Sequence, residues 1–166
     1  MAHLTLKGNP VTTNGELPKV GEKIKDFELI KIDSSSIFLK DLIGQQLVLN
    51  IFPSVDTGTC AASVREFNKR AVSLQNTKVL CISRDLPFAH KRFCGAEGIE
   101  NVLSLSDFNT GKFGKDNGLE ITTGVLNHLH SRVVMILDEK GIIKYIEQVS
   151  EISSEPNYEE ALSALV

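Results

Sequence analysis

The sequence has few cysteines, no excess of positive charge and no long apolar run. Its 166 residues include only three cysteines. Such a small, odd number does not build the disulfide framework of a secreted protein, so we expect free thiols in a reducing compartment, with catalytic or packing roles. The net charge of -3 is spread along the chain and forms no basic footprint. DNA and RNA are therefore not expected as partners.

Membrane and leader signals are also missing. No apolar stretch approaches the roughly 20 residues of a membrane span. Residues 1–7 lack the basic-then-apolar plan of a signal peptide. We therefore expect a cytoplasmic protein that does not bind membranes. Because 42% of the residues are hydrophobic, a chain of this length can bury roughly 70% of its unfolded surface. Residues 1–166 are expected to form a single domain that needs no metal or disulfide to hold its core.

The apolar pattern predicts alternating strands and helices. Short runs rich in branched residues predict buried strands at 47–52, 78–83, 102–105 and 132–137. Helices are predicted from Cys60 onward, from Pro87 to Gly95 or Gly98, over 108–117, and from Pro156 to the end. Residues 4–13 predict a hairpin, within an N-terminal extension spanning 1–16, and the Asp138–Gly141 turn predicts an antiparallel pair at the sheet edge.

This order of elements indicates an α/β fold. The strand, helix, strand succession around Cys60 implies a right-handed parallel crossover. An antiparallel hairpin and a closing helix follow it. The whole is a thioredoxin-like plan, with a mixed central sheet flanked by helices and an N-terminal β-hairpin.

Cys60 is the first candidate for chemistry. It follows a Pro/Gly loop after a buried strand and stands in the first turn of a predicted helix. N–H groups at a helix start are unpaired and the helix dipole is positive there, so a thiolate is stabilised and reactive. The alternative is a small buried hydrophobe, the usual fate of a free cysteine. The polar turn before Cys60 favours the reactive role.

The remaining cysteines and two histidines are less specific. Cys94 falls in the last turn of its predicted helix, and its position alone leaves packing and redox roles equally open. Cys81 lies inside a buried strand and is expected to be a core residue. His128 and His130 flank Leu129, but two histidines without a third ligand are weak evidence for a metal. We expect an exposed pair on a loop.

Several motifs resemble one family. The pattern Pro53-x-x-x-Thr57-x-x-Cys60 is the Pro-x-x-x-Thr-x-x-Cys pattern of the peroxiredoxins. The intact Arg-Phe-Cys-Gly-Ala-Glu-Gly at 92–98 resembles the bacterial thiol peroxidase subfamily in particular. The likeness extends from Gly8 to Glu159, so it covers nearly the whole chain.

The resemblance implies a role for five residues. It makes Cys60 the peroxidatic cysteine and Cys94 the resolving cysteine, with an intrachain disulfide between them and partial unwinding when it forms. Pro53, Thr57 and Arg132 are the implied supporting set. Arg132 can stabilise the thiolate and hold a peroxide with its fork of donors. The Thr57 hydroxyl can bind the peroxide oxygens or cap the helix, and rigid Pro53 can exclude water.

The resemblance also implies partners. The expected substrates are alkyl or lipid hydroperoxides and hydrogen peroxide, and the expected reductant is thioredoxin. The resemblance implies a homodimer and no cofactor. Relatives are expected to have small or apolar residues where this chain has His128 and His130. The substrate entrance and its pH response are therefore expected to differ from theirs.

Two other functions compete with a peroxidase. A disulfide oxidoreductase or thiol carrier would normally place a second cysteine where this chain has Thr57. A redox-sensing or holdase protein would use disulfide formation to expose apolar surface. Rapid, stoichiometric thiol loss with a hydroperoxide distinguishes the peroxidase from both.

Overall fold

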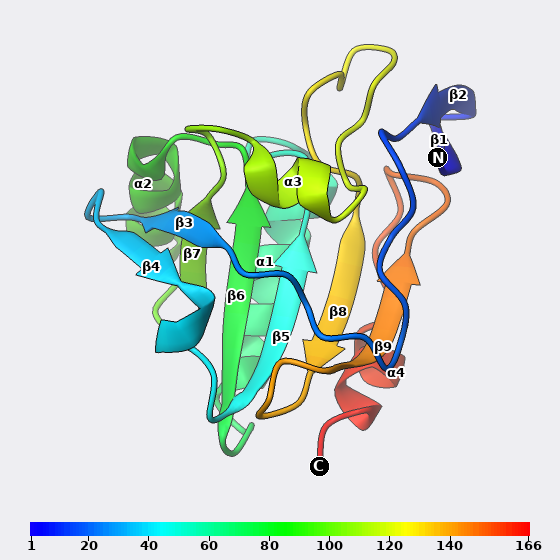
Figure 1. Cartoon of the computed structure of the whole chain (residues 1–166). Coiled ribbons are helices and arrows are strands. Elements are labelled where there is room, and N and C mark those ends of the chain that lie inside the picture. The colour runs from blue at the N-terminus through cyan, green and yellow to red at the C-terminus, as the bar shows by residue number, and fades with distance from the viewer.

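A seven-stranded mixed sheet is the framework of the structure (Figure 1), which is a computed structural model describing residues 1–166. The strand order is β4-β3-β7-β6-β5-β8-β9. The central strands β5, β6 and β7 are parallel, and the other neighbours are antiparallel. The strand bounds are β3 Glu28–Lys31, β4 Ser36–Phe38, β5 Gln46–Ile51, β6 Thr77–Ser83, β7 Leu103–Ser106, β8 Val133–Leu137 and β9 Ile143–Gln148.

Helices cover both faces of this sheet. Their bounds are α1 Gly58–Ala71, α2 Pro87–Glu97, α3 Lys112–Asp116 and α4 Tyr158–Ser163, with a short 3-10 turn at Leu39–Asp41. One apolar cluster joins α1, α2 and α4 to one face of the sheet, and a second joins α3 and the 3-10 turn to the other. Figure 1 shows α1 behind the sheet and α3 in front of it. None of the helices is both long and apolar enough to cross a membrane.

Burial on both faces explains the apolar runs that predicted the central strands. All six residues of β5 are buried. Leu47 and Leu49 face the cluster under α3, whereas Val48 faces the cluster under α1. In that second cluster the ring of Tyr158 packs edge-on against Phe67, with centroids 5.1 Å apart. Alternate side chains of one strand therefore serve two cores.

The expected architecture is confirmed, including the parallel crossover, the antiparallel edge pair β8–β9 and the closing helix. The N-terminal hairpin forms a separate two-stranded sheet of β1 His3–Leu6 and β2 Asn9–Thr12. Because Leu6 pairs with Asn9, Lys7 and Gly8 alone make the turn. Their φ angles of +50° and +82° fit the two-residue hairpin turns that match strand twist.

The helix predicted over 108–117 is shorter than expected. α3 begins at Lys112 and follows Gly111, which has a φ of +67°. The preceding backbone is held by the Arg84 guanidinium, whose Nε and Nη2 donate to the carbonyls of Asp107 and Phe108 at 3.2 and 3.0 Å. The Asp107 carbonyl also accepts the backbone N–H of Gly111 at 3.1 Å, so the carbonyl that Arg84 takes from a longer helix is that of Phe108.

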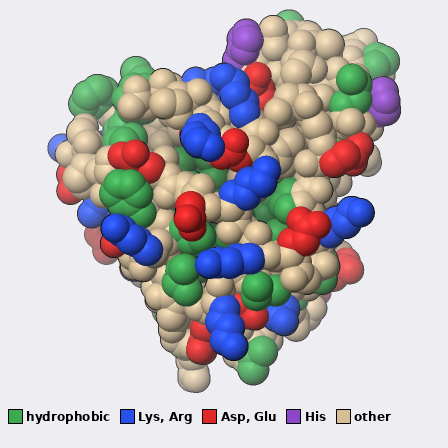
Figure 2. All heavy atoms as spheres, viewed as in Figure 1, with side chains coloured by type: hydrophobic (Ala, Val, Ile, Leu, Met, Phe, Trp, Pro, Cys, Tyr) green, Lys and Arg blue, Asp and Glu red, His purple; other side chains and the backbone are tan.

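Positive and negative side chains alternate over the face shown in Figure 2, where Lys and Arg lie among Asp and Glu. No broad surface of a single sign is visible in that view. The charge distribution on this face therefore agrees with the interspersed charges of the sequence.

We expect Gly118→Ala to destabilise the fold by more than about 1 kcal/mol. Gly118 has a φ of +67°, and an added Cβ would lie 2.3 Å from the backbone oxygen of Glu16. The matched control is Gly95→Ala inside α2, where an added Cβ meets nothing within 4 Å and should stabilise by about 0.5–1 kcal/mol. Urea unfolding measures both, and equal free energies of unfolding for the two variants would contradict the expectation.

Candidate active site

The sheet register brings Cys60 to Arg132, although 72 residues separate them. β5 ends at Ile51, which pairs with Val133 at the start of antiparallel β8. The end of β5 and the start of β8 therefore lie at the same edge of the sheet. The loop after β5 leads into α1, whose third residue is Cys60, and Arg132 directly precedes β8.

The Cys60 sulfur and the Arg132 guanidinium are in direct contact. Arg132 Nη2 lies 3.2 Å from Cys60 Sγ, and Nε donates to the carbonyl of Ile152 at 2.9 Å. Cys60 is fully buried and Arg132 is 1% exposed. A buried cation is costly unless it is paired, so this guanidinium favours an anionic sulfur. Its third nitrogen, Nη1, has no partner in the structure and is a free donor.

The start of α1 is a second source of positive potential at the Cys60 sulfur. The first helical hydrogen bond runs from Ala61 N to the carbonyl of Thr57 at 3.0 Å. The N–H groups of Gly58, Thr59 and Cys60 therefore have no helical partner, and the helix dipole is positive at the sulfur. The predicted position of Cys60 in the first turn is confirmed by the helix bounds.

Thr57 occupies the N-cap position but does not cap with its side chain. Its hydroxyl donates to the carbonyl of Ser54 at 3.1 Å. The residue is exposed, so its hydroxyl oxygen keeps lone pairs available to a ligand. Of the two roles expected for Thr57, the side-chain cap is absent.

A cavity of about 400 Å³ is lined by Arg132, which contacts the Cys60 sulfur, although Cys60 itself does not line it. Pro53, Thr57 and Arg132 all line it, so the structure brings together three of the predicted site residues around Cys60. The other lining residues come from the hairpin, the first turn of α1, the loop after β9 and the loop before β8: Leu6, Lys7, Gly58, Thr59, Leu126, Ile152 and Ser153. Sequence reasoning missed the residues outside the motif, because nothing in the spacing connects these segments.

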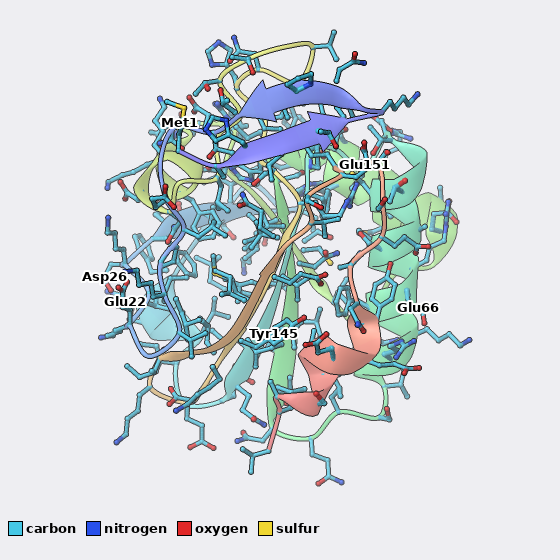
Figure 3. The ribbon with its side chains drawn as sticks, turned by 90° about the vertical axis from the view of Figure 1, so that its right-hand side faces the viewer. Met1, Glu22, Asp26, Glu66, Tyr145 and Glu151 are labelled. Carbon is cyan, nitrogen blue, oxygen red and sulfur yellow. The ribbon has the colours of Figure 1, made fainter.

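The loop after β9 is tied down by a carboxylate. Glu151 accepts hydrogen bonds from the backbone N–H groups of Lys7, Gly8 and Ser153 and from the hydroxyls of Thr5 and Ser153. The bonds from Ser153, then those from the hairpin, hold the pKa of the Glu151 carboxyl well below its usual range. Figure 3 shows Glu151 next to the hairpin.

This anchoring matters to the site because the same loop contacts both sides of the sulfur. The carbonyl of Ile152 orients Arg132. The carbonyl of Ser153 accepts from Thr59 Oγ1 at 2.8 Å, in the first turn of α1. The hairpin therefore supports the site indirectly, through Glu151.

Cys94 lies apart from Cys60 in this structure, and both thiols are free. Cys94 stands in the last turn of α2 with its sulfur 3.3 Å from Ser104 Oγ on β7. Arg132, the partner of Cys60, precedes β8. Three strand spacings separate β7 from β8, which is about 14 Å. A disulfide between the two cysteines requires a rearrangement.

Cys81 is a core residue, as predicted. It is 1% exposed on β6. Burial raises the pKa of the Cys81 thiol to about 12, with the Asn50 amide opposing the shift. A protonated, enclosed thiol has little reactivity.

The expectation of an exposed histidine pair is wrong for His130. His128 is exposed, but the His130 ring is fully buried and its Nε2 lies 2.9 Å from Asp107 Oδ2. The absence of a side chain at Gly114 makes room for the ring, because a Cβ there would lie 2.7 Å from it. The described residues contain no group of three or more His, Cys, Asp or Glu side chains that could hold a metal ion.

Asp85 holds the loop that leads to Cys60. Its carboxylate accepts from Ser54 Oγ at 2.7 Å, Val55 N at 2.9 Å and Ser83 Oγ at 2.5 Å. Burial opposes ionisation, but the hydrogen bonds from His90, Ser83, Ser54 and Val55 outweigh it and lower the pKa of Asp85 to about 2. Asp85 does not cap the next helix, whose N-cap is Leu86.

Comparisons with known proteins give a consistent result. The profile of the Redoxin family matches residues 19–162. A protein of Corynebacterium glutamicum named thiol peroxidase is 52% identical over 165 residues, which cover 99% of each chain. A solved structure, a peroxiredoxin-like protein from Aquifex aeolicus, matches with a TM-score of 0.92 and 33% identity, over 98% of this chain and 95% of that one.

A second solved structure concerns the fold alone. A thiol peroxidase from Chromobacterium violaceum has a TM-score of 0.90 at 19% identity, over 97% of this chain and 93% of that one. The predicted thioredoxin-like fold of the peroxiredoxin type is confirmed by these structural matches.

We expect Asp85→Asn to reduce the acid sensitivity of the fold. A carboxyl with a lowered folded pKa stabilises the protein above its unfolded pKa of about 4. That contribution is lost as the pH falls through the folded pKa of about 2. Wild-type stability should therefore drop between pH 4 and pH 2 more steeply than that of Asp85→Asn. Urea unfolding at pH 7, 4, 3 and 2 measures the slopes.

The control for this experiment is Asp26→Asn, because Asp26 is an exposed carboxyl in no salt bridge. The free energy of unfolding of Asp26→Asn should fall with pH as steeply as that of the wild type. Parallel pH profiles in the wild type and Asp85→Asn would show that the carboxylate adds no stability.

Proposed function

This chain belongs to the Redoxin family and is a peroxidase of the thiol peroxidase type, and we propose that it reduces alkyl and lipid hydroperoxides and hydrogen peroxide through Cys60 and Cys94. One observation carries this assignment. The Cys60 sulfur lies at a helix start, 3.2 Å from a buried guanidinium, beside a cavity that the guanidinium lines.

The first step is attack of the Cys60 thiolate on one peroxide oxygen. A sulfur–oxygen bond forms and the oxygen–oxygen bond breaks, so the sulfur is oxidised to a sulfenic acid and the peroxide is reduced. The departing oxygen leaves as alkoxide or hydroxide and takes a proton to become an alcohol or water. Negative charge therefore moves from the sulfur to the departing oxygen.

The supporting residues act on that moving charge. Arg132 Nη1, which has no partner in the structure, can donate to the peroxide oxygens, while Nη2 remains on the sulfur. The Thr57 hydroxyl oxygen can accept the peroxide proton and fix the orientation of the substrate. Pro53 is buried and has no N–H, so it excludes water without competing for the sulfur. In other enzymes, each hydrogen-bond donor aimed at developing negative charge raises the catalytic rate about 10²–10³-fold.

The apolar part of the cavity supports organic hydroperoxides as substrates. Leu6, Leu126 and Ile152 line it together with the Arg132 guanidinium. An alkyl chain can contact these side chains while its peroxide group reaches the sulfur. Hydrogen peroxide needs only the polar end of the same cavity.

In the second step the Cys94 thiol attacks the sulfenic acid, a disulfide forms, and water leaves with the sulfenic oxygen. Because the two sulfurs contact different parts of the sheet, Ser104 on β7 and Arg132 before β8, the start of α1 and the end of α2 must unwind first. Thioredoxin then reduces the disulfide by thiol exchange and restores both thiols. Such a cycle serves antioxidant defence.

We also propose a homodimer. Phe88 on α2 and Val125 in the loop before β8 are 69% and 88% exposed. Large apolar side chains at such exposure suit a protein contact. The cytoplasm, which keeps thiols reduced, is the proposed location.

We expect Cys60→Ser to abolish the first turnover, because no other thiol contacts Arg132. Cys94→Ser should still consume one peroxide and then stall or oxidise further to a sulfinic acid. Thiol titration and mass spectrometry after one equivalent of cumene hydroperoxide measure both outcomes. Cys81→Ala is the control and should cycle with thioredoxin, and complete loss of the first turnover in both serine variants would contradict the roles.

A separate test concerns the guanidinium. Arg132→Lys keeps the charge, but one ammonium cannot contact the sulfur, the Ile152 carbonyl and a peroxide in the same geometry. We expect the rate of sulfenic acid formation to fall about 10²-fold, by analogy with the loss of one such donor. Stopped-flow kinetics measure it, with Arg70→Lys, which pairs with Glu66 on α1, as control. A near-normal rate in Arg132→Lys would remove the residue from the mechanism.

A further inference from the structure

A buried histidine lies on the helix that carries Cys94. His90 stands one turn before Cys94 in α2 and is 1% exposed. Its Nε2 lies 2.8 Å from Ser83 Oγ and 3.7 Å from Asp85 Oδ2. Its other nitrogen, Nδ1, is buried without a partner. The peroxidase steps described above do not use this side chain.

The hydrogen-bond directions follow from the Ser83 hydroxyl. That hydroxyl has one proton and donates it to Asp85 Oδ2 at 2.5 Å. Ser83 Oγ is therefore the acceptor for His90, whose Nε2 carries the proton. The chain of donors runs from α2 through Ser83 to Asp85.

Asp85 continues the connection to the other cysteine. The same carboxylate accepts from Ser54 Oγ and Val55 N in the loop that leads to Cys60. A single network, in which His90 and Ser83 are buried and Asp85 and Ser54 are partly buried, thus ties the helix of Cys94 to the loop of Cys60. On the surface, Arg92 of α2 pairs with Asp56 of that loop at 2.7 Å, which joins the same two segments again.

These ties oppose the movement that joins the cysteines. A disulfide requires α carbons within about 7 Å, whereas the two sulfurs contact different parts of the sheet, Ser104 on β7 and Arg132 before β8. Both segments must therefore leave their places, and the network holds them there. The unpaired Nδ1 weakens this hold, because a buried polar atom without a partner is unfavourable.

We propose that the His90–Ser83–Asp85 network is a latch that sets how fast Cys94 reaches the Cys60 sulfenic acid. His90 is a positioning residue in this inference, which rests on the proposed two-cysteine function. The latch holds the end of β6, α2 and the loop before Cys60 together. Its opening then permits disulfide formation.

The latch also determines the fate of the sulfenic acid. That group either condenses with Cys94 and releases water, or reacts with a second peroxide to give a sulfinic acid and an alcohol or water. A firm latch prolongs the life of the sulfenic acid and favours the sulfinic acid. A loosened latch favours the disulfide.

The experiment compares His90→Leu with His90→Gln and with Lys91→Met, an exposed neighbour on the same helix. Stopped-flow fluorescence or quenched-flow alkylation separates sulfenic acid formation from disulfide formation with one equivalent of cumene hydroperoxide. We expect His90→Leu to form the disulfide about five- to tenfold faster, the factor of one net hydrogen bond, with the first step unchanged. Its sulfinic fraction at high peroxide should fall correspondingly.

The glutamine variant distinguishes a latch from a general packing defect. Its amide can donate to Ser83 Oγ as the imidazole does, so His90→Gln should restore wild-type partitioning, and Lys91→Met should match the wild type. If His90→Leu does not fold, Ser83→Ala removes the same link and should show the same acceleration. Hydrogen exchange of the 87–97 amides should quicken in either variant.

Two failures remain distinguishable. If the wild type forms no intrachain disulfide, the proposed function fails. If the wild type forms it, but His90→Leu forms it no faster, or His90→Gln behaves like His90→Leu, only the latch is overturned.

Discussion

The contact between the Arg132 guanidinium and the Cys60 sulfur is the constraint on which the site depends. A buried guanidinium needs acceptors for its donors, and here the acceptors are one carbonyl and one sulfur. The pairing of β5 with β8 places both groups at one edge of the sheet. The residual donor, Nη1, is the part of the cation that is free to meet a substrate.

Two carboxylates anchor the segments that form this contact. Glu151 joins the N-terminal hairpin to the loop that supplies the Ile152 carbonyl. Asp85 joins the end of β6 to the loop before Cys60. Hydrogen bonds lower the pKa of both groups, so both remain ionised at neutral pH. The Cys60 sulfur is therefore held in place by polar anchors, whereas the sheet beneath it is held by apolar packing.

Much of the fold was predictable because its strongest signals are local. Apolar runs predict the buried strands, because β5 and β8 are covered on both faces. Of the two predicted ends of α2, Gly95 and Gly98, the structure has Gly98, which adopts a φ of +64°. The position of the hairpin turn, the start of α3 and the burial of His130 lack such local signals. Each depends on a partner distant in the chain, or on a backbone conformation that several residues can adopt.

The sequence by itself determined the strand, loop and helix that deliver Cys60 to a helix start, because neighbours along the chain set that geometry. It also determined the family, through motifs that span nearly the whole chain. Only the tertiary structure decided that Glu151 supports the Ile152 carbonyl, that Leu6 and Lys7 line the cavity, and that His90 is linked to the Cys60 loop. Such contacts join segments tens of residues apart, and their closeness follows from sheet register and packing, which no local pattern encodes.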